Sequence, residues 1–418
     1  MEDFVILSPL LMSWLEFAVR WLHVITAMAW IGSSFYFIAL DLGLRKADNL
    51  PKGAHGEEWQ VHGGGFYHIR KFLVAPEAMP EHLIWFKWES YSTWLSGAAL
   101  LALVYWMGAE LYLIDAAKLE FEVWQAVAIS AGSLILGWII YDVLCKSSLG
   151  EKPTALMILL FVMLVVMAWG YNQVFTGRAT MLHLGAFTAT IMTANVFLII
   201  MPNQRIVVAD LKAGTTPDAK YGKIAKLRST HNNYLTLPVI FLMLSNHYPL
   251  AFASPYNWLI AALVFLMGVT IRHYFNTRHA RAGNPIWTIP ATMVLFFAAV
   301  WLSLLPPQEM NETGEEMEQT SALTHDQMRL ASHANFEQVT EIVQGRCSMC
   351  HAEEPGWDGI PTAPKGVLLE TEGQISAAAD LIYLHAGRTN AMPPANITYM
   401  EEEERRIIRN WYHDFLRG

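Results

Sequence analysis

Eight apolar stretches in the N-terminal part of the chain constrain its fold more than any other feature. Each approaches the ~20 residues with which a helix crosses a hydrocarbon core. They cover roughly residues 10–40, 84–113, 122–144, 154–173, 179–201, 232–248, 257–276 and 286–305. Only 16% of the 418 residues are charged, against the ~25% typical of soluble domains. The sequence therefore predicts an all-α fold, a polytopic membrane helix bundle of about eight transmembrane helices in a lipid bilayer.

The loops between these stretches differ in charge, and the difference predicts an orientation. Fifteen Lys and Arg lie in loops 41–83, 145–153, 202–230 and 277–285, whereas the N-terminus and the other three loops hold only Lys118 and Arg178. Cytoplasmic loops carry the excess of Lys and Arg, so we expect these four loops in the cytoplasm and the C-terminus in the periplasm of a bacterial inner membrane. The net charge of -9 gives no reason to expect nucleic acid as a partner.

The C-terminal part contains the run Cys347-Ser-Met-Cys350-His351. Two thiols at this C-x-x-C-H spacing attach a haem covalently, and the following His ligates its iron. Met392, which is followed by two prolines, is the expected second axial ligand; the alternatives are His385 and an open position. We therefore predict one haem c, bound through Cys347 and Cys350. Its attachment is periplasmic chemistry, in agreement with the orientation from loop charges.

Composition divides the chain into a transmembrane domain (1–306), an acidic linker (307–335) and a cytochrome c domain (336–418). The linker has five Glu between Glu309 and Glu318. Apolar residues at helical spacing begin at Phe336 and recur from Ile407 to Phe415, which predicts a helix at each end of the last segment. A periplasmic domain this small buries little core alone, and a haem would supply the missing apolar mass.

Histidines inside the apolar stretches suggest a second, non-covalent haem b. An ionisable residue in a bilayer is costly without a partner, and paired imidazoles suit a haem iron. The candidate ligands are His23, His183, His231, His247 and His273. Their predicted depths place His23, His183 and His247 in a periplasmic group. The same estimate places His231 and His273 in a cytoplasmic pair. For the histidines at helix ends, the alternative is a position at the membrane–water interface without haem binding. Arg20 faces either a haem propionate or Glu16, one helical turn away.

The long first cytoplasmic loop, residues 53–81, carries aromatic, His and Arg side chains that suit a planar anionic substrate. Its candidates for catalysis are His62, His68 and Arg70. His231 and Asn232, at the same predicted membrane face, extend this set of candidates.

Three segments in order resemble the membrane-integral bacterial urate hydroxylases (urate oxidases of the PuuD type). They are Arg20–Tyr36, Thr230–Pro238 and Met392–Thr398. The resemblance implies oxidation of urate to 5-hydroxyisourate, with electrons passed to the fused cytochrome c and on to a periplasmic cytochrome or terminal oxidase, and not directly to oxygen. The run from Leu22 to Tyr36 is also similar to the small membrane protoporphyrinogen oxidases, which implies that His23 binds haem.

Two other functions use the same parts. A quinol–cytochrome c oxidoreductase would take its electrons from the bilayer, and a non-enzymatic membrane electron-relay subunit would turn over neither substrate. An oxygen-reducing oxidase is not expected, because the sequence has no adjacent His pair with a third His nearby to hold copper.

Overall fold

The computed structural model describes most of the chain. The described residues are 2–72, 80–115, 118–119, 121–252, 254–305, 330–333, 335–357, 360, 363–388, 392–393 and 397–417. The predicted acidic linker therefore lies outside the described residues, except for residues 330–333 and 335.

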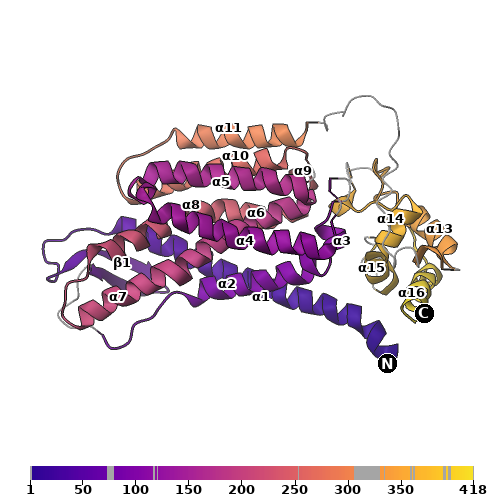
Figure 1. The fold of residues 1–418 in the computed structure, drawn as a ribbon, viewed down its shortest axis with the longest axis horizontal. Coiled ribbons are helices and arrows are strands. Elements are labelled where there is room, and N and C mark those ends of the chain that lie inside the picture. The colour runs from indigo at the N-terminus through magenta and orange to yellow at the C-terminus, as the bar shows by residue number, and fades with distance from the viewer. Residues whose placement is uncertain are drawn as a thin grey trace.

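The N-terminal part is a bundle of helices that run along one common direction (Figure 1). The long helices are α1 (Glu2–Gly43), α2 (Trp88–Leu100), α4 (Val123–Lys146), α5 (Pro153–Val174), α6 (Gly177–Ala194), α7 (Met201–Lys212), α8 (Ala219–Leu244), α10 (Asn257–His279) and α11 (Thr288–Ser303). Short turns of helix join them: η1 (Leu101–Trp106), α3 (Ala109–Tyr112), η2 (Ser148–Glu151), η3 (Asn195–Ile200), η4 (Ser245–His247) and α9 (Pro249–Phe252). The mainly helical fold predicted from the sequence is confirmed.

Within the residues that the structure describes, five helical segments are long and apolar enough to cross a membrane, where the sequence suggested about eight. They are Leu11–Gly43, Val123–Lys146, Pro153–Val174, Gly177–Lys212 and Asn257–His279. The other three apolar stretches also form helices, but α11 is shorter and α2 gives way to the π-helical turn η1. The first turns of α8 contain Lys220, Lys223 and Lys226. Length and charge therefore separate these three helices from the five.

Large apolar side chains cover the outside of several of these helices. On α4, Ile135, Leu136 and Val143 are each about 60% exposed, and Val294 and Trp301 of α11 are exposed to a similar extent. An apolar surface of this size on a protein marks contact with a membrane or a partner. Here it continues along helices of membrane-spanning length, as expected of lipid-facing helices.

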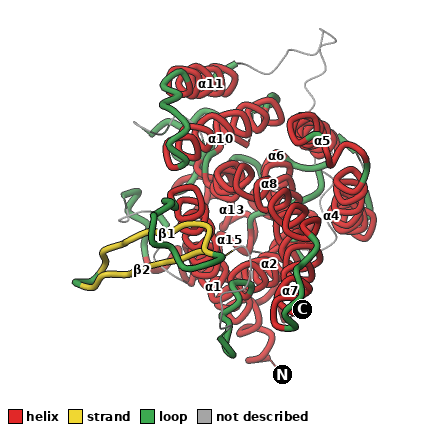
Figure 2. The backbone as a smooth tube through the Cα atoms, turned by 90° about the vertical axis from the view of Figure 1, so that its left-hand side faces the viewer, coloured by secondary structure: helices red, strands yellow, loops and turns green. Residues whose placement is uncertain are grey.

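The first long loop contains a β-hairpin, which the all-α prediction missed. Strand β1 (Ala54–His62) pairs with the antiparallel strand β2 (Gly65–Phe72). Gly63 and Gly64 form the turn with φ values of 58° and 80°, and a two-residue turn of this kind requires φ > 0 at both positions. The glycine run is therefore explained by the turn. The hairpin extends from the bundle (Figure 2), at the end opposite the C-terminal domain (Figure 1).

The C-terminal domain has its own core. It is built from α13 (Phe336–Arg346), η5 (Pro364–Gly366), α14 (Glu372–Ala377), α15 (Ala379–Ile382), η6 (Tyr383–Arg388) and α16 (Glu402–Arg417). The two predicted helices thus exist, as α13 and α16. Phe336 stacks on the fully buried Trp411 with 5.8 Å between ring centroids, and Arg346 pairs with Glu404. These contacts hold the first and last helices of the domain together.

Candidate functional site

The C-x-x-C-H run forms a tight turn at the end of α13. The N–H of Cys347 donates to the Val343 carbonyl at 2.8 Å, and the N–H groups of Cys350 and His351 donate to the Cys347 carbonyl at 3.1 and 2.9 Å. Neither cysteine is in a disulfide. Burial raises the pKa of the Cys347 thiol to about 12 and also raises that of Cys350, so both thiols are neutral at physiological pH.

The imidazole of His351 is oriented by a backbone carbonyl. Its Nδ1 lies 2.9 Å from the Val367 oxygen, and since a carbonyl only accepts, Nδ1 carries the proton. The lone pair of Nε2 is then available. Metal-binding histidines are generally fixed in this way, with the other ring nitrogen donating to a carbonyl or carboxylate.

Met392 lies on a loop that the buried Arg405 fixes from α16. The Arg405 guanidinium donates to the carbonyls of Ala386 and Met392 at 2.7 and 2.9 Å. The Met392 N–H donates to the His385 carbonyl at 2.9 Å, and the Met392 side chain packs partly buried against the core of this domain. The thioether predicted as a ligand therefore has a defined place.

These residues fit a covalent haem c. Two thiols outside any disulfide, an imidazole whose Nε2 is available and the Met392 thioether all line one cavity. Apolar side chains from the same domain complete that wall, among them Val367, Leu369, Ile382 and Ile397. Such a wall suits the apolar faces of a porphyrin.

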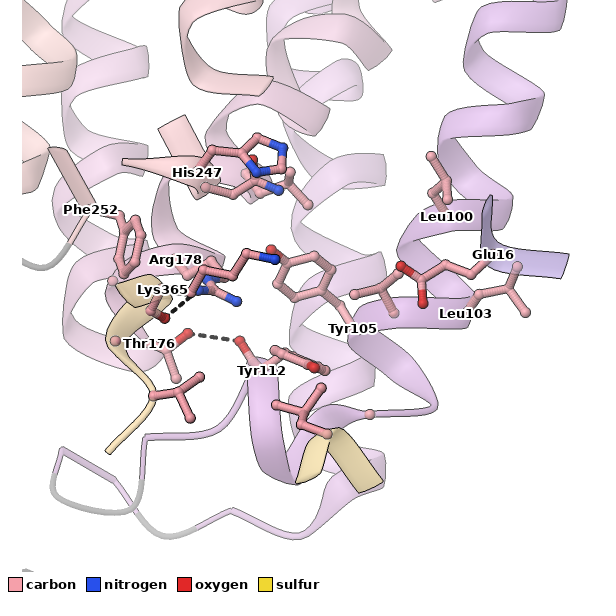
Figure 3. A pocket seen from close by; sticks show the side chains of 18 of the residues that line it. Glu16, Leu100, Leu103, Tyr105, Tyr112, Thr176, Arg178, His247, Phe252 and Lys365 are labelled. Carbon is pink, nitrogen blue, oxygen red and sulfur yellow. Dashed lines mark hydrogen bonds between the residues drawn. The ribbon is translucent and has the colours of Figure 1, made fainter. Parts of the chain in front are cut away.

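The same cavity continues into the helix bundle. It has a volume of about 3630 Å³, and its bundle wall comes from α1, α2, η1, α6 and the end of α8. Figure 3 shows the part where bundle residues such as Tyr105 and Arg178 meet Lys365 of the C-terminal domain. The haem motif and the membrane helices therefore line one cavity.

His23 reaches this cavity from α1. Its Nδ1 lies 3.0 Å from the Thr93 carbonyl and 3.1 Å from Ser96 Oγ, both on α2. Gly97 makes room for the ring, because a Cβ there would lie 2.9 Å from His23 Cε1. With Nδ1 donating to a carbonyl, Nε2 keeps its lone pair, as in His351.

His183 does not share this arrangement, although the sequence placed it in the same group. It is fully buried, its Nδ1 lies 2.8 Å from the Ala179 carbonyl, and its Nε2 lies 2.8 Å from Ser130 Oγ. Ser130 Oγ also accepts from Trp106 Nε1, so its own proton goes to His183. Both ring nitrogens are therefore used within the protein.

His231 and Asn232 belong to a buried polar network. Tyr141 O–H donates to His231 Nδ1 at 2.7 Å, and Asn195 donates to both Tyr141 and Asn232. Arg228 joins Asn195 to Asp142. His231 Nε2 is buried and has no hydrogen-bond partner in the described part of the chain. Among the described residues, no hydrogen bond or ring contact joins His231 to His273, whose ring packs near Trp287 instead.

The candidates on the first loop lie on the hairpin, away from the cavity. His68 Nε2 is 2.7 Å from Glu57 Oε2 and its ring stacks on Trp59 at 4.1 Å. Arg70 approaches the same carboxylate at 3.5 Å, and His62 is exposed beside the turn. The hydrogen bond from His68 lowers the pKa of Glu57. In the described part of the chain, no three His, Cys, Asp or Glu are arranged to hold a metal ion.

Residues that the sequence did not mark as candidates for a site lie where the two domains meet. Arg178 Nη2 donates to the Lys365 carbonyl at 2.7 Å, and its guanidinium lies 5.0 Å from the Phe252 ring centroid. Gly177 allows the start of α6 to lie close to the backbone of Phe252, because a Cβ at position 177 would lie 2.1 Å from the Phe252 carbonyl. Tyr105 is 4% exposed and points toward both cations (Figure 3). No spacing links Tyr105, Arg178 and Lys365, which are joined only by the fold.

Comparison with known proteins gives one significant result. No curated protein and no solved structure matches the chain significantly. The family model described as urate oxidase N-terminal matches residues 9–303, which include all the long helices of the bundle from α2 to α11 and nearly all of α1. Because this match covers well over half of the chain, the protein belongs to the urate oxidase N-terminal family.

Proposed function

We propose that this protein is a membrane-bound urate hydroxylase, which oxidises urate to 5-hydroxyisourate and delivers the electrons to a covalent haem c in its own C-terminal domain. The observation that carries the proposal is the shared cavity. One wall consists of helices in the urate oxidase match, and the other contains Cys347, Cys350, His351 and Met392.

The chemistry balances with water as the oxygen source. Urate and one water give 5-hydroxyisourate, two protons and two electrons. The haem supplies a one-electron acceptor, to be used twice per turnover and reoxidised by a periplasmic cytochrome or terminal oxidase. The chain's contribution is to hold that group through Cys347 and Cys350, to fix the tautomer of His351 through Val367, and to fix the Met392 loop through Arg405.

The proposed location is the bacterial inner membrane. We propose that all eight apolar stretches cross it as helices, with residues 1–306 as the membrane domain, 307–335 as the linker and 336–418 as a periplasmic cytochrome c domain. Loop charge supports this orientation: the hairpin and α7, from Lys- and Arg-rich loops, lie at the end of the bundle opposite the C-terminal domain (Figure 1). The buried apolar residues also form two clusters, Leu101 to Phe265 and Leu330 to Tyr412.

We propose a non-covalent haem b with His23 as one ligand. His23 lines the cavity and has its Nδ1 engaged by Thr93, which leaves Nε2 for the iron. His247 in η4 lines the same cavity and is the second candidate. His183, His231 and His273 are not retained in this ligand set, because none of them lines the cavity.

The test is anaerobic addition of urate to the detergent-purified protein, followed by the haem absorption spectrum. We expect reduction of the c-type band with a stoichiometry of one urate per two haems. A Cys347→Ser/Cys350→Ser variant is the control, because it cannot hold the haem covalently. Reduction by quinol and not by urate would replace the proposal with a quinol–cytochrome c oxidoreductase. Reduction by neither would leave an electron-relay subunit.

A further inference from the structure

The junction between the two domains gathers positive charge around a buried tyrosine. Arg178 comes from the first turn of α6, Lys365 from η5 of the C-terminal domain, and Tyr105 from η1. All three line the shared cavity, and Figure 3 shows their polar ends directed into the same space. We call this group of three side chains the junction pocket.

Carboxylates such as Glu16 and Asp380 line the same cavity, but none of them pairs with the two cations of the junction pocket within the described residues. In the described part of the chain neither Arg178 nor Lys365 forms an ion pair, whereas Arg20, across the cavity, is paired with Glu16. Arg178 spends one N–H on the Lys365 carbonyl and keeps its remaining donors. Two cations beside an apolar wall favour an organic anion, because charge-assisted hydrogen bonds are stronger away from bulk water.

Tyr105 adds a polar group to the same space. Its side chain is 4% exposed, and its hydroxyl is directed into the cavity toward Arg178 and Lys365 (Figure 3). A hydroxyl directed into a cavity beside two cations is suited to donate to an oxygen of a bound anion.

We propose that the junction pocket binds the substrate anion of the proposed function, next to the haem motif and on the periplasmic side. Urate is planar, carries one negative charge at neutral pH and presents three carbonyl oxygens. Arg178 and Lys365 would neutralise its charge, Tyr105 would donate to one oxygen, and the Phe252 and Tyr112 rings that flank Arg178 would exclude water. This assignment rests on the proposed function and replaces the cytoplasmic entry suggested by the first loop.

The assignment simplifies the path of the electrons. Substrate, Cys347 and His351 would share one cavity at one face of the membrane, so the two electrons removed from urate would not cross the bilayer. The two protons would be released at the same face.

A second source of the same anion chemistry is a haem propionate. A haem b held by His23 would place its carboxylates in this cavity, and Arg178 and Lys365 would pair with them equally well. If the pocket binds urate, substitution of its residues should lower the affinity for urate. If the pocket binds a haem propionate, the same substitutions should lower the amount of bound haem b.

The experiment measures urate binding to the chemically pre-reduced full-length protein, which cannot turn over. We expect Arg178→Gln and Lys365→Gln each to weaken urate binding by about 10- to 100-fold, because each removes a cation. Tyr105→Phe should weaken binding less, because it removes only one hydroxyl group. Arg281→Gln is the matched control, because Arg281 also donates to a backbone carbonyl, that of Gly43, but lies in a loop at the other end of the bundle. Its affinity should equal that of the wild type.

Two further measurements make the outcomes decisive. Haem b and haem c are counted in every variant by the pyridine haemochrome spectrum, and urate is added to either side of oriented proteoliposomes. Three results would each overturn the inference. The first is an unchanged urate affinity in the three variants, and the second is a loss of bound haem b with no loss of urate affinity. The third is haem reduction by urate only from the side opposite the C-terminal domain. These results would leave the proposed function standing if wild-type haem is reduced by urate. A wild type that urate neither binds nor reduces would remove both.

Discussion

His23 and His183 make the same first hydrogen bond and differ in the second. Each uses Nδ1 to donate to a backbone carbonyl, that of Thr93 or of Ala179. The Nε2 of His183 then accepts from Ser130, whereas His23 lines a cavity and its Nε2 has no hydrogen-bond partner among the described residues. The difference teaches that the second ring nitrogen decides whether a histidine is available as a ligand, and His351, with Nδ1 bonded to the Val367 carbonyl, follows the pattern of His23.

The strongest test of this comparison replaces each histidine in turn. We expect His23→Ala to abolish haem b binding, because it removes the iron ligand, and His183→Ala to retain haem b at a lower thermal stability. The ratio of haem b to haem c in purified protein is the measurement. Loss of haem b from His183→Ala, with His23→Ala unaffected, would reverse the assignment.

Ser130→Ala tests the partner that occupies His183. It leaves both His183 Nε2 and Trp106 Nε1 buried without a hydrogen bond, which costs about 1–3 kcal/mol for each unsatisfied group. We expect a clear fall in the midpoint of thermal unfolding with haem b retained. Ser303→Ala is the control, since the hydroxyl of Ser303 is exposed and bonds only within its own helix; an equal fall in both would remove the role of Ser130.

Gly97→Ala tests the support of His23 without touching the imidazole. The added methyl would lie 2.9 Å from Cε1 and push the ring out of place. We expect a partial loss of haem b, smaller than in His23→Ala. The control is Gly132→Ala on α4, where a Cβ meets nothing within 4 Å. Full haem b content in Gly97→Ala would show that the ring tolerates displacement.

In the hairpin, His68 is paired with a carboxylate, that of Glu57, and not with a backbone carbonyl. Loss of this pair has the smallest expected effect of these substitutions. His68 lowers the pKa of Glu57. A depressed carboxylate pKa contributes stability above its ordinary value of 4.5, and that stability is lost as the pH falls through the depressed value. The hydrogen-exchange protection factors of residues 54–72, which are corrected for the intrinsic pH dependence of amide exchange, should therefore fall at acid pH. Glu57→Gln should show the lower protection already at neutral pH; a wild type whose protection does not depend on pH in this way would contradict the pairing.

The proposed haem c set could be picked out from the sequence because its chemistry is local. Cys347, Cys350 and His351 lie within five positions, and they form a turn at the end of α13. Met392 was proposed from its downstream position and its prolines, but Arg405, which anchors its loop, was not foreseen. A buried arginine that bonds two carbonyls has no pattern in sequence.

The junction pocket was not accessible in the same way. Tyr105, Arg178 and Lys365 come from three distant segments and meet only after two domains have folded. Arg178 did stand out as one of two cations in loops otherwise free of them, a weak signal that was used only for orientation. The hairpin was missed because its residues were considered for their side chains and not for the turn that Gly63 and Gly64 form.

Pro238 and Gly268 have a consequence for which substitutions this bundle tolerates. The proline lies inside α8, and a Cβ at Gly268 on α10 would approach its ring to 2.6 Å. A larger residue at 268 would force α8 and α10 apart, and with them both His231 and His247, which occupy opposite ends of the same helix region. A larger residue at position 268 is therefore expected to be tolerated only in a chain in which Pro238 has already been replaced. The order of the two substitutions thus decides whether the singly substituted protein is destabilised.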